Sequence, residues 1–242
     1  MSARTAANRA AIGLDDASVR GEEMVMNRSD AETLWDVASV LARNAAKVSR
    51  TESRAVGNLP PLLFFTDPDR TPRPWETAAR LPAGSGVVLR HFGHADAHDT
   101  ARRLREETAR RDCLLLIGLD AELAEQVGAD GVHLPERALN QAKALSMAQP
   151  NWRITGTAHS LQTFEHAANL DAVVVSPVFV AGGASSTKPS LGLEVLKLMT
   201  ATSSRPVYAL GGIDGGNARS LIGSGVYGLA GVGAIQAAFG PH

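Results

Sequence analysis

Cysteine and long apolar runs are scarce in this sequence. Cys113 is the only cysteine among the 242 residues, which excludes an intrachain disulfide framework and a zinc site built from several cysteines. No apolar stretch approaches the ~18 residues that a membrane-spanning helix needs. The start of the chain also lacks the basic segment, apolar run and small-residue cleavage site of a secretory signal. We therefore expect a reducing, cytoplasmic location and no membrane partner.

The chain also lacks an excess of charge of either sign. Its 24 Lys and Arg residues face 25 Asp and Glu residues, which leaves a net charge of -1. No basic patch with interleaved aromatic residues is present, so a nucleic-acid partner is not expected. Hydrophobic residues make up 44% and charged residues 20%, values typical of a globular chain of enzyme size.

Three parts can be distinguished along the chain. Residues 1–28 lack a sustained apolar period and are expected to be disordered. Residues 29–58 contain an amphipathic helix followed by a linker that ends at a proline pair. Residues 59–242 carry the repeating strand signals and form the main domain.

The amphipathic helix is predicted over residues 30–48, with Ser29 or Asp30 as its cap. Its apolar residues recur at helical spacing: Leu34, Val37, Val40 and Leu41. One apolar stripe of this kind packs on the main domain or on a partner, and a homodimer is one arrangement that the sequence allows.

The main domain contains eight apolar, β-prone runs. They are Leu62–Thr66, Gly86–Arg90, Cys113–Gly118, Gly131–Leu134, Arg153–Ala158, Ala172–Val178, Pro206–Leu210 and Gly228–Val232. Most show little polar alternation, as strands buried on both faces of a parallel sheet do. Helix-like stretches lie between them: Thr100–Arg111, Ala121–Val127, Glu136–Met147, Leu161–Asn169, Leu193–Thr200 and Asn217–Ser224.

This alternation predicts an α/β fold, a (β/α)8 TIM barrel with an N-terminal helical extension. An open doubly wound sheet is the competing fold. It should have a glycine-rich loop directly after the first strand, where this sequence has Thr66-Asp67-Pro68-Asp69. The barrel is therefore favoured.

Two loops after the last strands are candidates for binding phosphate. Gly211 and Gly212 follow the seventh run, and Val232 and Gly233 follow the eighth, at the start of a final helix. Glycines let the backbone approach an anion, and free N–H groups at a helix start favour one. Side by side, these loops predict a phosphate cradle that needs no Lys or Arg; tight turn geometry alone is the alternative.

The loop after the sixth strand is rich in glycine and serine. Ser185, Thr187 and Lys188 offer two hydroxyls and one ammonium group, which suit a phosphate or a pyrophosphate. The same composition is also typical of an ordinary solvated loop.

Other side chains at strand ends are candidates for chemistry. Arg90 ends the second strand as a charged fork at the barrel mouth or as part of a rim salt bridge. His159 ends the fifth strand and could move a proton near pH 7, whereas His133 is expected to be structural. A group of His91, His94, Asp96, His98 and Asp99 follows no regular spacing for metal ligands.

Five motifs, in their order along the chain, resemble a known enzyme family. They are Gly128-Ala-Asp-Gly-Val-His-Leu134, Thr157-Ala-His159, Asp171-Ala-Val-Val-Val-Ser-Pro-Val-Phe179, Ser185-Ser-Thr-Lys188 and Ala209-Leu-Gly-Gly-Ile213. Over residues 59–238 the chain looks like thiamine phosphate synthase, and equally like its relative, the TenI-type thiazole tautomerase. The resemblance implies a (β/α)8 barrel and small phosphorylated substrates. The synthase joins hydroxymethylpyrimidine diphosphate to thiazole phosphate and releases pyrophosphate with the help of Mg2+.

The family's thiazole-phosphate-binding positions have matching residues in this sequence. The resemblance implies substrate-binding roles for these positions: Thr157, Ser185, Ser186, Thr187, Gly211, Gly212, Val232 and Gly233. It implies that Arg90 and Lys188 neutralise the diphosphate of the second substrate.

The family's Mg2+-binding positions, by contrast, are not matched in this sequence. Leu119 and Ala138 stand where the family has carboxylates that bind Mg2+, and Phe92 stands where it has a lysine. The nearest acids are Asp120 and Glu136, which are therefore the candidate ligands if Mg2+ is used.

Matched substrate-binding positions combined with unmatched metal-binding positions are compatible with three functions. The leading one is a thiamine phosphate synthase-like transferase. The second is a tautomerase that needs no metal and uses His159 for proton transfer. The third is a barrel that binds a phosphorylated ligand without catalysis.

Overall fold

The fold is that of a computed structural model, which describes residues 29–48, 59–165, 169–182, 187 and 189–241. The N-terminal segment expected to be disordered, residues 1–28, lies outside the described residues, as does most of the linker. Within the described residues no helix combines the length and the apolar character that a membrane span requires. The cytoplasmic location stays a prediction.

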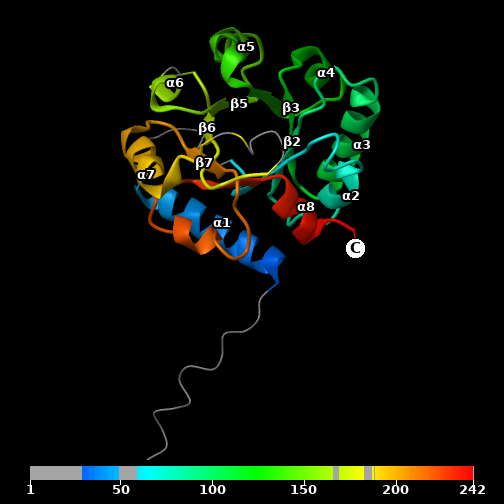
Figure 1. The fold of residues 1–242 in the computed structure, drawn as a ribbon. Helices are drawn as coiled ribbons and strands as arrows, with labels where there is room; N and C mark the ends of the chain where they lie inside the picture. The colour runs from blue at the N-terminus through cyan, green and yellow to red at the C-terminus, as the bar shows by residue number, and fades with distance from the viewer. Residues whose placement is uncertain (1–28, 49–58, 166–168, 183–186, 188, 242) are drawn as a thin grey trace, which may run out of the picture.

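Eight parallel strands form a closed barrel in sequence order, and β1 pairs with β8 to complete it (Figure 1). The strands are β1 (Leu62–Phe65), β2 (Gly86–Leu89), β3 (Leu114–Gly118), β4 (Gly131–Leu134), β5 (Arg153–Ala158), β6 (Ala172–Val175), β7 (Val207–Leu210) and β8 (Gly228–Gly231). Each lies within one of the eight predicted runs. The predicted (β/α)8 barrel is confirmed.

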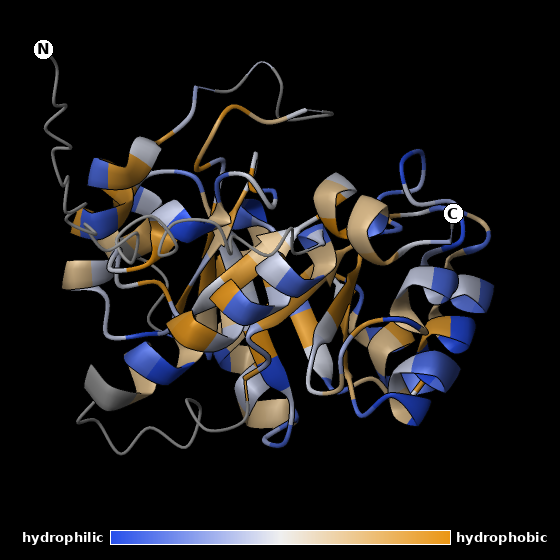
Figure 2. Cartoon of the chain, turned by 90° about the horizontal axis from the view of Figure 1, so that it is seen from below, coloured by the Kyte–Doolittle hydropathy of each residue, from blue (hydrophilic) through white to orange (hydrophobic). Residues whose placement is uncertain are grey.

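The strands lack polar alternation because both of their faces are buried. In β1, Leu62 and Phe64 pack outward with apolar residues of the surrounding helices, whereas Leu63 and Phe65 belong to a second cluster with inward residues of other strands. Figure 2 shows the same arrangement as hydrophobic strands surrounded by helices that are partly hydrophilic. Alternate side chains of a strand point to opposite faces, so two apolar environments require a continuous apolar run.

The helices agree with the predicted stretches except in three places, one of which is the helix expected over Glu136–Met147, whose first half is a 3-10 segment. The helices are α1 (Asp30–Val48), α2 (Pro74–Ala78), α3 (Ala97–Arg110), α4 (Ala121–Gln126), α5 (Ala142–Ala148), α6 (Leu161–Glu165), α7 (Gly192–Thr202) and α8 (Gly233–Phe239), with 3-10 segments η2 (Glu136–Gln141) and η4 (Ala218–Leu221). Helix α2 was not predicted, because five residues are too few to show a helical period.

The helix expected over Asn217–Ser224 is wrong in extent, since only the 3-10 segment η4 forms there. Glycines on both sides shorten it, and α1 lies beside it against β8 and α8. Gly215 allows this approach, because a Cβ at that position would lie 2.1 Å from Oδ1 of Asp30.

Helix α1 covers the barrel with its apolar stripe. At its start, the Glu32 carboxylate accepts a hydrogen bond from the Ser29 backbone N–H at 3.1 Å, and the Ser29 hydroxyl accepts one from the Glu32 N–H at 3.3 Å. This reciprocal pair is a capping box, so Ser29 is the cap. Leu34, Val37 and Leu41 are buried against the barrel.

Because α1 belongs to the hydrophobic core, shortening Leu41 should destabilise the whole domain. Leu41→Ala is expected to lower the free energy of unfolding by about 2–5 kcal/mol. Asn44→Ala, at an exposed position of the same helix, should change it by less than about 0.5 kcal/mol. Urea unfolding of both variants measures the difference, and equal effects would show that α1 does not pack on the barrel.

Candidate active site

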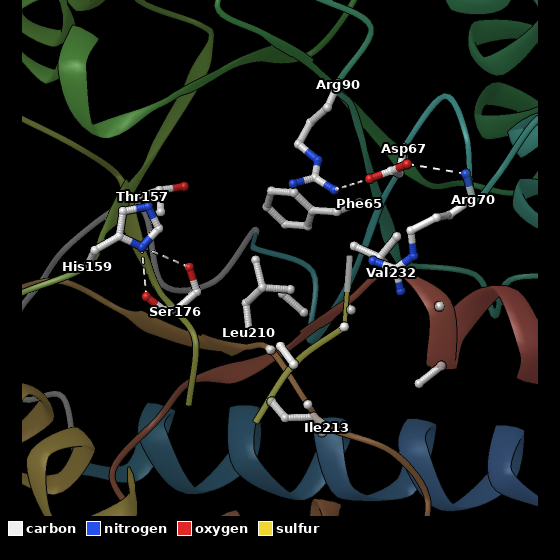
Figure 3. A pocket seen from close by; sticks show the side chains of 18 of the residues that line it. Phe65, Asp67, Arg70, Arg90, Thr157, His159, Ser176, Leu210, Ile213 and Val232 are labelled. Carbon is white, nitrogen blue, oxygen red and sulfur yellow. Dashed lines mark hydrogen bonds and ion pairs between the residues drawn. The ribbon is translucent and has the colours of Figure 1, made fainter. Parts of the chain in front are cut away.

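A cavity of about 440 Å3 opens at the carboxyl ends of the barrel strands, where barrels of this kind carry their sites (Figure 3). Side chains and loops that follow most of the strands line it. They include Phe65, Asp67, Arg70, Arg90, Phe92, His133, Glu136, Thr157, His159, Ser176, Val180, Gly211, Gly212, Asp214, Val232 and Gly233. The cavity thus brings together eight residues predicted from the sequence: Arg90, Glu136, Thr157, His159, Gly211, Gly212, Val232 and Gly233.

Arg90 extends from the end of β2 into the cavity. Its Nε donates a hydrogen bond to the Thr66 carbonyl oxygen at 2.9 Å, and one terminal nitrogen lies 3.8 Å from Oδ2 of Asp67. The guanidinium carbon lies 5.4 Å from the centre of the Phe65 ring. Burial lowers the pKa of Arg90 and Asp67 opposes that shift, but a guanidinium stays protonated at neutral pH. The cavity therefore contains a fixed positive charge.

Arg70 supplies a second positive charge that the sequence did not reveal. Oδ1 of Asp67 accepts hydrogen bonds from the backbone N–H groups of Asp69 and Arg70, at 3.3 and 3.2 Å, which folds the loop after β1 into a tight turn. A Cβ on Gly233 would lie 2.5 Å from a terminal nitrogen of Arg70. The guanidinium therefore lies against the loop after β8, so a cation stands beside the cradle that was expected to need none.

The loop after β7 has a backbone that only glycine adopts easily. Gly211 has φ 102° and Gly212 has φ 68°. A Cβ on Gly211 would lie 2.8 Å from Cα of Pro177, and one on Gly212 would lie 2.4 Å from the Val180 carbonyl oxygen. The Asn217 side-chain amide donates to the Gly212 carbonyl at 2.7 Å. The two glycines therefore leave an open backbone surface beside the loop after β8.

His159 is held in one tautomer. Its Nδ1 lies 2.7 Å from the Ser176 carbonyl oxygen, which only accepts hydrogen bonds, so Nδ1 of the neutral ring carries the proton and Nε2 the lone pair. The His159 backbone N–H donates to Oε2 of Glu136 at 3.0 Å, while the Thr163 hydroxyl donates to Oε1 at 2.7 Å. Glu136 therefore fixes the strand end that carries this imidazole.

His133 lies deeper in the barrel and is buried. Its Nδ1 lies 2.9 Å from the Thr155 hydroxyl and its Nε2 lies 2.8 Å from the Thr157 hydroxyl. Burial lowers the pKa of His133 to about 3, with a smaller contribution from the positive charge of Arg90. The neutral ring orients Thr157, whose side chain reaches the cavity. These contacts agree with the structural role predicted for His133.

The sequence profile of the family described as thiamine monophosphate synthase matches residues 69–235, more than half of the chain. The chain belongs to the thiamine monophosphate synthase family. The putative thiamine-phosphate synthase 2 of Aquifex aeolicus is 33% identical over 57% of this chain and 74% of its own length. The thiamine-phosphate synthase of Vibrio campbellii is 30% identical over 72% of this chain and 89% of its own length.

Solved structures show the same fold. The thiamine phosphate pyrophosphorylase from Pyrococcus furiosus superposes with a TM-score of 0.63 at 24% identity, over 74% of this chain and 91% of that one. This likeness agrees with the barrel and its closure.

The residues of this family member do not fit a magnesium ion at the positions that the resemblance implies. Leu119 and buried Ala138 carry no ligand atoms in their side chains. Asp120 caps α4, where its Oδ1 accepts a hydrogen bond from the Leu123 N–H at 2.9 Å, and it does not line the cavity. Both oxygens of Glu136 already accept hydrogen bonds. The structure therefore gives Asp120 and Glu136 other roles than the predicted metal ligation.

The loop after β6 and the histidine-rich group after β2 also contain predicted site residues. Ser185, Ser186 and Lys188 lie outside the described residues, and Thr187 is exposed, so the roles of this loop stay predictions. In the histidine-rich group after β2, the rings of His91 and His94 lie 5.6 Å apart. Among the described residues, no three His, Cys, Asp or Glu side chains are grouped so as to hold a metal ion.

The low pKa of His133 predicts that acid destabilises the thiamine monophosphate synthase barrel. Below pH ~6.5 the unfolded chain takes up a proton at this histidine that the folded protein excludes until about pH 3. The free energy of unfolding therefore decreases as the pH is lowered through that window, by about 2 kcal/mol from pH 7 to pH 5.

Urea unfolding at both pH values, compared with His133→Gln, isolates this contribution. The substitution shifts stability at every pH, but it should remove about 2 kcal/mol of the pH dependence. An unchanged pH dependence in the variant would contradict the assignment.

Proposed function

We propose that this chain is a transferase of the thiamine-phosphate synthase type, which joins hydroxymethylpyrimidine diphosphate to thiazole phosphate in thiamine biosynthesis. Its family and the names of its relatives support this function. The observation that carries it at the site is the presence of two guanidinium groups in one cavity, those of Arg70 and Arg90. A reaction between two anionic substrates needs two positively charged regions, one for each substrate.

The two guanidinium groups lie beside different loops, and we assign one substrate to each. Arg70 lies beside Gly233 in the same cavity that Gly212 lines, where it can bind a compact monophosphate. Arg90 lies on the other side of Asp67, at the end of β2 (Figure 3). We assign the thiazole phosphate to the first region and the diphosphate to the second.

In the reaction, the bond between the pyrimidine methylene carbon and the diphosphate oxygen breaks, and the thiazole nitrogen forms a bond to the same carbon. The electron pair of the broken bond leaves with pyrophosphate. Arg90 stabilises this developing negative charge from a partly buried position, where its effect is larger than in water. Lys188 is the second cation that the resemblance predicts for the diphosphate, in addition to Arg90.

Removing the Arg70 guanidinium should weaken binding of the thiazole phosphate. Charge-assisted hydrogen bonds contribute about 1.5–3 kcal/mol, so Arg70→Gln is expected to raise the Kd about 10- to 100-fold. Isothermal titration with thiazole phosphate measures it. Arg73→Gln is the matched control, because Arg73 is exposed and pairs with Glu76. Equal Kd values for both variants would exclude Arg70 from the phosphate site.

A second candidate function is the tautomerase, which the fixed tautomer of His159 favours. An imidazole whose Nδ1 donates to a carbonyl carries the lone pair of its neutral form on Nε2, and proton transfer on a bound thiazole phosphate needs one acceptor of this kind. Thr157 and Ser176 line the cavity beside it.

The two functions differ in what His159→Ala should do. If the chain is a synthase, the variant keeps most of the turnover measured with both substrates. If it is a tautomerase, thiazole phosphate isomerises without the pyrimidine substrate, and the variant loses about 100-fold or more of that rate. Isomer-resolved NMR and thiamine phosphate formation are followed in parallel. Binding without either turnover would indicate a barrel that only binds its ligand.

A further inference from the structure

The carboxylates that line the cavity are already engaged within the protein. Asp67 accepts two backbone hydrogen bonds and faces Arg90, and Glu136 accepts one hydrogen bond at each oxygen. Oδ1 of Asp214 accepts hydrogen bonds from the N–H groups of Gly216 and Asn217. A divalent cation prefers oxygen ligands that can converge on it. These three carboxylates are instead tied to separate loops.

An aromatic ring occupies the wall of the cavity between β2 and β3. Phe92 follows β2, lines the cavity and is 45% exposed. It packs closely on Gly118 at the end of β3, since a Cβ there would lie 3.0 Å from the ring. This side chain covers the strand end next to Leu119 with carbon atoms.

A guanidinium group lies beside this ring and directly follows Glu136, which lines the cavity. The Arg137 guanidinium carbon lies 6.0 Å from the centre of the Phe92 ring, within the range of a cation–π interaction. Arg137 is exposed, and its neighbour Glu136 is turned toward His159 and Thr163. In the part of the chain that the structure describes, no carboxylate lies within ion-pair distance of Arg137.

We infer that Arg137, supported by the Phe92 ring, acts with Arg90 to bind the diphosphate of the second substrate without a divalent cation held by the protein. Guanidinium groups present paired N–H donors that match phosphate oxygens, and they keep their charge at every physiological pH. The inference rests on the proposed transferase function, because it names the groups that recognise the leaving diphosphate.

Inorganic pyrophosphate, the released product, is the probe. Isothermal titration is done with the full chain in EDTA and again with Mg2+ in both cell and syringe. We expect the two Kd values to agree within about threefold, which corresponds to less than 1 kcal/mol. Binding that requires Mg2+, or that is more than about tenfold tighter with it, would overturn the inference. So would the absence of binding under both conditions.

Variants test the residues. In EDTA, Arg137→Gln is expected to weaken pyrophosphate binding about tenfold, and Arg137→Lys should recover part of the loss. Phe92→Leu removes the ring that positions Arg137 and should weaken binding by a smaller factor. Arg110→Gln is the control, because Arg110 is exposed on α3 and pairs with Glu107. Wild-type affinity in the Arg137→Gln variant would contradict the inference.

Product formation separates this inference from the proposed function. Thiamine phosphate formed in EDTA supports both. Pyrophosphate that binds without metal, with no product under either condition, supports the inference and overturns the synthase. Product and pyrophosphate binding that both require Mg2+ overturn the inference and leave the synthase intact.

Discussion

The pairing of β1 with β8 is the constraint on which the cavity depends. The two strands lie at opposite ends of the barrel sequence, and their parallel register places Phe64 opposite Gly231. Only this closure brings the loop that carries Arg70 against Gly233. In an open sheet the same residues would lie at two separate edges, and neither loop alone could surround an anion.

A single carboxylate organises the positive charge of the site. Two guanidinium groups facing one cavity repel each other, and the positive charge of Arg70 contributes to the lowered pKa of Arg90. Asp67 lies between them, accepting the Arg70 backbone N–H and facing the Arg90 side chain. Asp67 thus fixes the Arg70 loop through a backbone hydrogen bond and offsets the charge of the Arg90 guanidinium.

The sequence was most informative where one physical demand determines the residue type. Strands buried on both faces must be apolar, so all eight were found, and glycines with positive φ marked the loop after β7. Arg70 was missed because its position depends on a turn formed by Asp67, which composition does not reveal. Asp120 was misplaced for a similar reason: an aspartate just before a helix can reach a cavity or cap that helix, and only backbone direction decides. The loop containing Lys188 lies partly outside the described residues, so its role rests on resemblance.

The contact between Gly212 and the Val180 carbonyl links the loops after β6 and β7. Any side chain at position 212 would displace the backbone that borders the cavity from β6. A library aimed at substrate range should therefore keep this glycine and vary other positions of the two loops, because substitutions at position 212 would sample mostly damaged sites.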